Sequence, residues 1–320
     1  MLKKKPNTST NIFSQNVGIK YRFCFAFIMN NTFYPAKLLL FGEHTVLQGS
    51  QALAMPLLKY GGSWKYADDK TLQFDLPKFS NFLKQIVENS EIMLDTEGLA
   101  EALNQGLYFE SHIPRGYGVG SSGALVAGVY DKFCTIKTDN LLELKTIFGK
   151  MESYFHGSSS GFDPLICYIK KPVLIKKDKT IEALCSIKNE VQYFLIDTHI
   201  QRKAENLITI FADRCKTPQY NDLIINELVP NIDDGIAAFL NNMPDVLFET
   251  VHKISHFQYR YFPEAVPLAY KNAWLEGLAG DIYKLKLCGA GGGGFILGFC
   301  KNLEDTKQTL LKSGFNIIPL

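Results

Sequence analysis

Two short segments of this chain, residues 118–123 and 289–294, match the pattern GxGxxG. Glycines at this density allow positive φ angles and let backbone N–H groups approach an anion without obstruction by Cβ atoms. Residues 122–135, after the first loop, are rich in Ala, Leu and Val and predict a buried helix. The positive N-terminal end of such a helix would face the loop, which favours a phosphate site there.

The dinucleotide-binding motif and the Walker A loop both fit these segments poorly. Four residues, 114–117, separate the first loop from the strand predicted before it, whereas the dinucleotide motif turns directly from strand into helix. The second loop precedes a strand and lies too near the C-terminus for a βαβ unit, and neither loop ends in Gly-Lys-Ser/Thr. A phosphate cradle of another kind remains, with a tight turn capped by serine as the alternative. Its residues would be Gly118, Val119, Gly120, Ser121, Ser122 and Gly123.

The pattern along the chain predicts an α+β protein of two domains. Apolar runs predict strands at 37–41, 52–58, 63–66, 107–113, 172–176 and 191–196, and helical spacing predicts helices at 81–89, 96–105, 122–135 and 141–154. After residue 204 helices dominate, at 204–215, 221–240, 243–258 and 265–278. Strands flank the second glycine loop, and a helix at 302–312 and a strand at 315–318 follow. We expect the domains to cover 29–188 and 189–320.

Residues 1–28 contain five Lys or Arg residues and no Asp or Glu, so the remainder of the chain carries a net charge of −3 rather than +2. This mildly acidic body disfavours a nucleic-acid-binding protein. We interpret residues 1–28 as a non-structural extension or a start assigned too early, with Met29 as the true start; a transit peptide is the alternative.

Cysteine usage and hydropathy predict a cytoplasmic location. The seven cysteines form no CxxC pair, which favours buried thiols in a reducing compartment over disulfides or a zinc site. No run of 18 apolar residues occurs, so no membrane span and no membrane partner are expected.

Three charged residues could perform phosphoryl transfer, which needs Mg²⁺ ligands, a cation for the developing charge, and a group that takes or orients the hydroxyl proton. Glu152 lies on a predicted helix, and Asp163 lies in a Gly/Ser-rich loop, where Asp is commonly a turn former. Lys37 lies within an apolar strand. It would either extend to solvent or pair with Asp163.

Three segments, residues 35–49, 113–124 and 286–295, resemble the three signature motifs of the GHMP kinase superfamily (galacto-, homoserine, mevalonate and phosphomevalonate kinases) in their order and spacing. Residues 152–163 and 197–202 further resemble the corresponding stretches of mevalonate kinases. The resemblance implies a two-domain α+β fold. Its N-terminal domain would be ribosomal protein S5 domain 2-like and its C-terminal domain ferredoxin-like, with the active site in the cleft between them.

The resemblance also implies roles for individual residues. Asp163 would be the catalytic base, and Lys37 would favour its ionised form and stabilise transition-state charge. Glu152 and Ser122 would hold Mg²⁺, while residues 118–123 would bind ATP. The residues facing the substrate would be Glu43, His44, Thr198, Gly291 and Gly292.

Departures from the family pattern bear on the substrate. His199 stands where a Lys is usual, Ala204 where a Thr is common, and Gly123 where an Ala is usual. The Ser-Gly-Phe-Asp stretch at 160–163 is also close to phosphomevalonate kinases, whereas Val46 departs from galactokinases and the presence of Asp163 departs from homoserine kinases.

The leading hypothesis is ATP-dependent phosphorylation of the mevalonate hydroxyl by a monomer or homodimer, with a small-molecule substrate as its partner. The alternatives are a phosphomevalonate kinase, another sugar or polyol kinase of this superfamily, or a non-catalytic nucleotide or metabolite sensor on the same fold.

Overall fold

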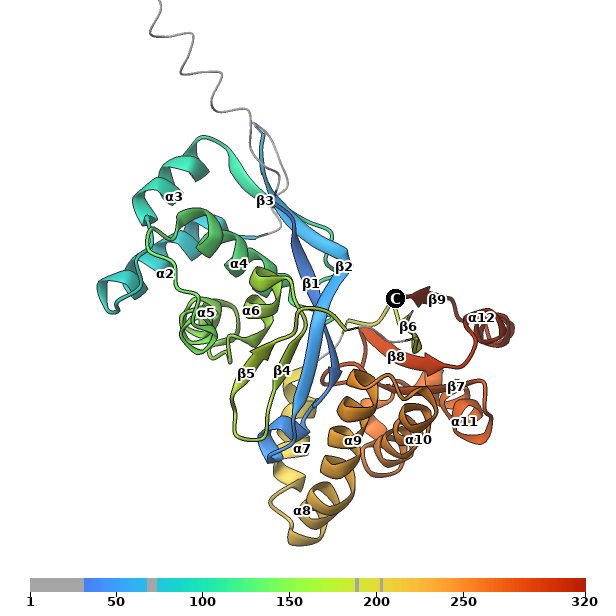
Figure 1. Cartoon of the computed structure of the whole chain (residues 1–320). Helices are drawn as coiled ribbons and strands as arrows, with labels where there is room; N and C mark the ends of the chain where they lie inside the picture. The colour runs from blue at the N-terminus through green and yellow to red at the C-terminus, as the bar shows by residue number, and fades with distance from the viewer. Residues whose placement is uncertain (1–31, 68–73, 188–189, 202–203) are drawn as a thin grey trace, which may run out of the picture. The chain divides into compact units, whose positions relative to one another are not determined.

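The computed structural model describes residues 32–67, 74–187, 190–201 and 204–320. The chain divides into two units, Met1–Thr32 and Phe33–Leu320, and every element below belongs to the second (Figure 1). The expectations for residues 1–28 and for Arg202 lie outside the described residues. Among the described helices, none is long and apolar enough to cross a membrane.

The first half of the second unit forms a five-stranded sheet in which neighbouring strands run antiparallel. Its order is β1 (Tyr34–Phe41), β2 (Ala52–Tyr66), β4 (Val173–Ile175) and β5 (Ile181–Ala183), with β3 (Leu107–Ser111) paired to β2. The strands predicted at 52–58 and 63–66 are one continuous strand, because β2 runs on through Gly61 and Gly62. A Cβ atom at either glycine would overlap the ring of Phe33 or Phe109, so the missing side chains let these rings lie against the strand.

Five helices accompany this sheet: α2 (Leu76–Glu88), α3 (Thr96–Asn104), α4 (Ser121–Phe133), α5 (Leu141–His156) and α6 (Phe162–Ile169). Figure 1 shows them gathered beside the blue-to-green strands. The α4 helix is buried along nearly its whole length and contacts β1, β2, α5 and α6. The α6 helix was not predicted. Its eight residues follow a Gly/Ser run that resembles a loop, and Asp163 therefore lies in a first helical turn instead of a turn between elements.

The second half forms a four-stranded antiparallel sheet in the order β7 (Tyr283–Leu287), β8 (Phe295–Cys300), β6 (Gln192–Asp197) and β9 (Ile317–Pro319). The accompanying helices are α7 (Ala204–Arg214), α8 (Pro218–Leu223), α9 (Val229–Leu240), α10 (Pro244–Tyr261), α11 (Lys271–Ala279) and α12 (Leu303–Lys312). The helix predicted at 221–240 is interrupted by a π-helical turn, Ile224–Leu228. Pro230 follows this turn at the start of α9 and has no N–H group to continue the α-helical bonding.

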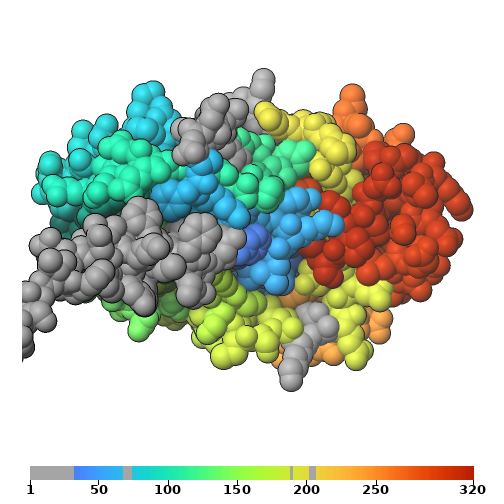
Figure 2. Space-filling view, turned by 90° about the horizontal axis from the view of Figure 1, so that it is seen from above, coloured from blue at the N-terminus to red at the C-terminus, as the bar shows by residue number. Residues whose placement is uncertain are grey.

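The two sheets share one hydrophobic core. Phe41 at the end of β1 stacks on Phe299 of β8 with ring centroids 5.8 Å apart, and Tyr60 of β2 lies 5.7 Å from Phe295. Figure 2 shows the blue-to-green and the yellow-to-red segments as adjoining regions. The first sheet ends at Ala183 and the second begins at Gln192. The bounds 29–188 and 189–320 stay a prediction.

Candidate active site

The first glycine loop leads directly into α4, whose N-cap is Gly120. Gly118 and Gly120 have φ angles of 62° and 80°, which L side chains adopt only with strain. The backbone N–H of Lys37 donates to the carbonyl of Val119 at 2.9 Å, so the loop continues the hydrogen bonding of β1. A Cβ atom at Gly120 would lie 3.0 Å from Cγ of Lys37. The loop and this lysine are therefore in direct contact, and the binding of phosphate by the loop stays a prediction.

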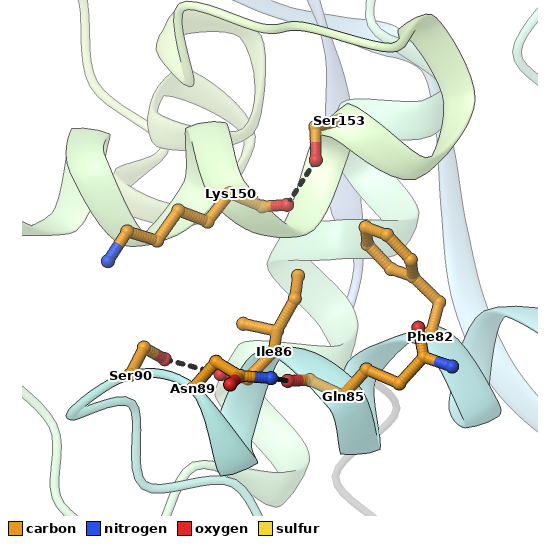
Figure 3. Close-up of a pocket in the computed structure, with 7 residues that line it drawn as sticks. All are labelled: Phe82, Gln85, Ile86, Asn89, Ser90, Lys150 and Ser153. Atoms are coloured by element: carbon orange, nitrogen blue, oxygen red, sulfur yellow. Dashed lines mark hydrogen bonds between the residues drawn. The ribbon is translucent and has the colours of Figure 1, made fainter.

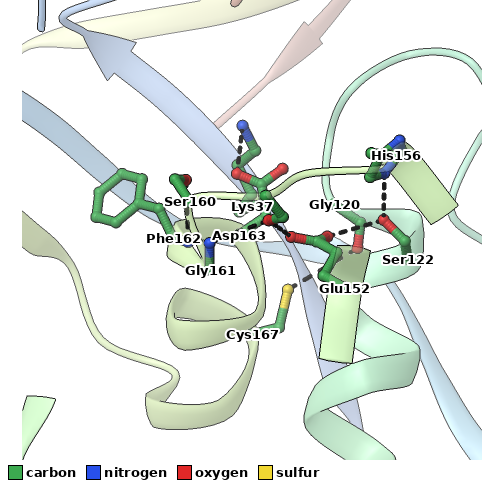
Figure 4. A network of polar contacts seen from close by, with 11 residues as sticks. Lys37, Gly120, Ser122, Glu152, His156, Ser160, Gly161, Phe162, Asp163 and Cys167 are labelled. Carbon is green, nitrogen blue, oxygen red and sulfur yellow. Dashed lines mark hydrogen bonds and ion pairs between the residues drawn. The ribbon is translucent and has the colours of Figure 1, made fainter. Parts of the chain in front are cut away.

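Lys37 pairs with Asp163 rather than extending to solvent. The Nζ atom lies 2.9 Å from Oδ1, and the two side chains are 9% and 29% exposed (Figure 4). Asp163 lies in the first turn of α6, where the helix dipole favours a negative charge. The arrangement places the Asp163 carboxylate at a partly open position beside the lysine side chain and the glycine loop.

Glu152 lies at the centre of a second set of polar contacts, which Figure 4 shows next to the Lys37–Asp163 pair. Ser122 Oγ donates to Oε1 of Glu152 at 2.9 Å, and Ser159 Oγ donates to Oε2 at 2.5 Å. Ser122 Oγ also lies 3.0 Å from Nε2 of His156. The predicted metal ligands Glu152 and Ser122 thus touch one another. Ser159 and His156 were not among the predicted site residues, although both lie in the stretch 152–163.

Burial is the main reason why the pKa of Glu152 is raised to about 7, and the nearby negative charge of Asp163 adds to it. The hydrogen bonds from Ser159 and Ser122 and the charge of Lys37 oppose this rise. The two carboxylates therefore differ in their surroundings, since Asp163 is paired with a lysine while Glu152 is enclosed by serines. Cys167 lies buried beneath them, and burial raises the pKa of its thiol well above its ordinary value, so it is an unreactive packing residue.

The donor atoms at this site fit Mg²⁺ bound together with a nucleotide. Among the described residues, no group of three or more His, Cys, Asp or Glu side chains could hold a metal alone. Mg²⁺ prefers oxygen ligands and commonly uses only one or two protein groups together with substrate phosphates, which the Glu152 carboxylate and the Ser122 hydroxyl can provide. The Ser121 hydroxyl is buried without a hydrogen-bond partner in the described part of the chain. A buried polar atom of this kind is suited to an incoming ligand.

Gly123 packs against the segment that carries Asp163. A Cβ atom at Gly123 would lie 2.9 Å from the carbonyl carbon of Asp163 and 2.9 Å from the nitrogen of Pro164. Its absence lets α4 and α6 approach closely. The predicted contact of Gly123 with ATP stays a prediction, while its packing role follows from this geometry.

The second glycine loop joins β7 to β8, and its residues 291–294 all have positive φ angles. The Gly292 N–H donates to Ala265 O at 2.7 Å, and the Gly294 N–H donates to Ile200 O at 2.8 Å. Thr198 donates to Gly294 O from both its N–H, at 3.0 Å, and its hydroxyl, at 2.7 Å. Thr198 is buried, and its two hydrogen bonds to Gly294 fix this loop.

Glu43 and His44, the other expected substrate residues, lie just after β1. The Oε1 atom of Glu43 lies 2.6 Å from Nζ of Lys286 and accepts a hydrogen bond from Gln258 at 2.8 Å. The side chains of Glu43 and Lys286 are 1% and 0% exposed. The His44 ring stacks on the Phe211 ring with centroids 4.7 Å apart, and the His44 backbone has a positive φ angle of 64°. The predicted residues therefore form two clusters, one around Asp163 and Glu152 and another at the second glycine loop, and substrate contacts of the latter stay predictions.

A pocket of about 270 Å³ between α2 and α5 lies apart from these clusters (Figure 3). It is lined by Phe82, Gln85, Ile86, Asn89, Ser90, Lys150 and Ser153. It contains no acidic side chain and shares no residue with the network of Figure 4. The α5 helix thus presents Glu152 to one cluster and Ser153 to this separate pocket.

Comparison with known proteins gives the class of this protein. Residues 81–171, which include the first glycine loop, Glu152 and Asp163, match the family described as GHMP kinases N terminal domain. The fold, with its two sheets, matches solved structures of this class over about nine tenths of the chain. The chain is thus similar to GHMP kinases, which are ATP-dependent small-molecule kinases that typically use Mg²⁺, and the match to the family itself covers residues 81–171.

Two curated relatives are mevalonate kinases. The enzyme of Pyrococcus furiosus is 23% identical over 322 residues, covering 87% of this chain and 91% of the relative. The enzyme of Archaeoglobus fulgidus is 24% identical over 295 residues, covering 87% and 94%.

Two solved structures are similar at lower identity. The Streptococcus pneumoniae phosphomevalonate kinase in complex with phosphomevalonate and AMPPNP has a TM-score of 0.64 at 15% identity, covering 91% of this chain and 100% of that one. The Lactococcus lactis galactokinase complexed with galactose has a TM-score of 0.63 at 16% identity, covering 94% and 95%. Structural similarity at this level fixes the fold and leaves the phosphate acceptor open.

Proposed function

We propose that this protein transfers the γ-phosphoryl group of ATP to the hydroxyl of mevalonate. The observation that carries the chemistry is the Lys37–Asp163 pair at 2.9 Å beside the first glycine loop. The choice of mevalonate rests on the similarity to two mevalonate kinases over 87% of the chain. Both the residue roles and the acceptor are part of the proposal.

The nucleotide would bind where the glycine loop meets α4. Backbone N–H groups of residues 118–121 and the positive end of α4 would bind the triphosphate, and the Ser121 hydroxyl, which has no partner among the described residues, would donate to it. Glu152 and Ser122 would hold Mg²⁺. The metal, when bound, neutralises the charge that develops on the phosphate oxygens.

In the transfer step, Asp163 would accept the proton of the substrate hydroxyl as its oxygen attacks the γ-phosphorus. The bond from phosphorus to the oxygen that bridges the β- and γ-phosphates breaks, and ADP leaves with that electron pair. Lys37 would pair with the Asp163 carboxylate before the step and would offset the negative charge at the transferred group during it. The partial exposure of Asp163 supports this role, because a fully enclosed carboxylate could not reach a substrate.

A panel of acceptors tests the substrate. Purified protein with ATP and Mg²⁺ would be given mevalonate, phosphomevalonate, galactose or homoserine, and ADP would be measured. We expect turnover with mevalonate only. Turnover with phosphomevalonate instead would establish the second candidate, since the fold is also similar to that of the Streptococcus pneumoniae phosphomevalonate kinase. Tight nucleotide binding without ADP from any acceptor would support a sensor.

The variant Asp163→Asn tests the mechanism, since it keeps the size of the side chain and removes its charge. We expect kcat to fall by about 10²–10⁴-fold, the usual contribution of a general base, with ATP binding retained. The control is Asp213→Ala, which breaks a surface pair with Lys216 and leaves kcat unchanged. Wild-type kcat in Asp163→Asn would contradict the proposed mechanism.

A further inference from the structure

Glu152 is held by hydroxyl groups from two different segments. It is 3% exposed, and each of its carboxylate oxygens accepts one serine hydroxyl. Ser122 comes from the first turn of α4, on the side of the glycine loop. Ser159 comes from the segment between α5 and α6. The terminal torsion of a glutamate is broad and would allow the carboxylate to rotate, so two bonds from opposite segments fix its plane.

Ser159 also connects Glu152 to the segment that carries Asp163. Its Oγ accepts the N–H of Gly161 at 3.0 Å, and Gly161 is the N-cap of α6. The same segment lies close against α5, because a Cβ atom at Gly149 would come within 2.9 Å of the Ser159 carbonyl oxygen. One serine therefore links the carboxylate of α5 to the start of the helix on which Asp163 lies.

The hydroxyl protons show how the network is directed. Ser159 has one hydroxyl proton, which goes to Glu152, while its oxygen accepts from Gly161. Ser122 likewise gives its proton to Glu152, so His156 must donate to Ser122 from Nε2 when Glu152 is ionised. Every hydrogen bond of this network is therefore directed toward Glu152. Each carboxylate oxygen then keeps a free lone pair for a cation.

We propose that Ser159 is a positioning residue that fixes the Glu152 carboxylate for metal binding and couples it to the segment carrying Asp163. The inference rests on the proposed function of Glu152 as a metal ligand. In this scheme Ser122, beside the glycine loop where the phosphates would bind, serves the metal directly, whereas Ser159 acts through Glu152. The partners that orient metal ligands commonly govern metal affinity by 10–100-fold.

The test measures metal binding without turnover. Mn²⁺ replaces Mg²⁺ as the probe, and free Mn²⁺ is followed by electron paramagnetic resonance with a non-hydrolysable ATP analogue and no acceptor. The variants are Ser159→Ala, Ser159→Thr and Ser153→Ala in the full chain. Ser153 is the matched control, since its hydroxyl donates to the Lys150 carbonyl and faces the pocket of Figure 3.

We expect Ser159→Ala to bind Mn²⁺ about 10-fold more weakly and to lower kcat with little change in the KM of the acceptor. Ser159→Thr keeps the hydroxyl and should bind Mn²⁺ like the wild type, as should Ser153→Ala. Wild-type Mn²⁺ affinity in Ser159→Ala would overturn the proposal, and so would equal losses in the Ala and Thr variants. Because no acceptor is present, the Mn²⁺ result is independent of whether mevalonate is the substrate.

Discussion

The buried ion pair between Glu43 and Lys286 allows a direct test of whether Glu43 serves the fold or the substrate. Both side chains are almost completely buried, and Gln258 links Glu43 to the residue after the lysine, because it donates to Glu43 and accepts from the N–H of Leu287. We would replace Lys286 by Met, Glu43 by Gln, and both together. The Lys286→Met change leaves a buried carboxylate whose second oxygen already has no hydrogen-bond partner among the described residues.

The expected loss follows from the geometry of the pair. At 2.6 Å and an effective dielectric constant of about 20, the attraction between the two charges is about 6 kcal/mol. Desolvation of both groups offsets much of this, so the net value of the intact pair is small. Removing one partner leaves the other charge buried and costs about 3–5 kcal/mol. The double variant should regain part of this loss, because no unpaired charge then remains.

Urea unfolding followed by tryptophan fluorescence measures these differences, since Trp64 and Trp274 both lie in the core. The control is Lys216→Met, which breaks a pair of similar length, 2.7 Å, whose side chains are 78% and 59% exposed. It should cost less than about 1 kcal/mol. The reasoning is wrong if Lys286→Met destabilises no more than Lys216→Met. A raised acceptor KM in Glu43→Gln at wild-type stability would instead assign Glu43 to the substrate.

Two further predictions concern Glu152 and Gly123. The pKa of Glu152 is raised to about 7 in the metal-free folded state, whereas the same carboxyl in the unfolded chain loses its proton above about pH 4.5. Its contribution to the free energy of unfolding therefore falls as the pH rises from about 4.5 to 7. Urea unfolding at pH 5 and 7.5 should show this fall reduced by about 2 kcal/mol in Glu152→Gln; an identical fall in the variant would contradict it. Gly123→Ala places a methyl group against the backbone of Asp163 and Pro164, and should cost about 1–3 kcal/mol and lower kcat. Wild-type melting temperature and kcat in Gly123→Ala would refute this packing argument.

Most elements of the fold follow from local patterns. The helices α4 and α5 and the strands β1 and β6 lie where apolar spacing predicts them, because their burial is continuous along one face or all around. The pattern failed where tertiary contacts decide the outcome. β2 passes through Gly61 and Gly62, where the rings of Phe33, just before β1, and Phe109 of β3 fill the space of the missing side chains.

The charged residues of the candidate site could be predicted from the sequence, whereas most of the contacts that support them could not. Lys37 in an apolar strand needed a partner, and Asp163 is that partner. The α6 helix that orients Asp163 was missed, since its N-terminal Gly/Ser run has the composition of a loop. Ser159 gave no signal in the sequence, because a serine among serines has no distinguishing pattern. Its role depends on the proximity of the 157–161 segment to α5, which only the folded chain reveals.

The contacts between the signature segments explain in physical terms why such distant stretches act together. Glu43, after the first strand, pairs with Lys286 just before the second glycine loop. Tyr117, just before the first glycine loop, donates its hydroxyl proton to Asp197 at 2.8 Å, and the neighbouring Thr198 holds Gly294. Each motif therefore binds another through a buried or partly buried polar bond rather than by apolar packing alone. Because such bonds are directional, a shift of either glycine loop would break at least one of them. The bonds therefore hold the two sheets in the relative position that brings the first loop, Lys37 and Asp163 together.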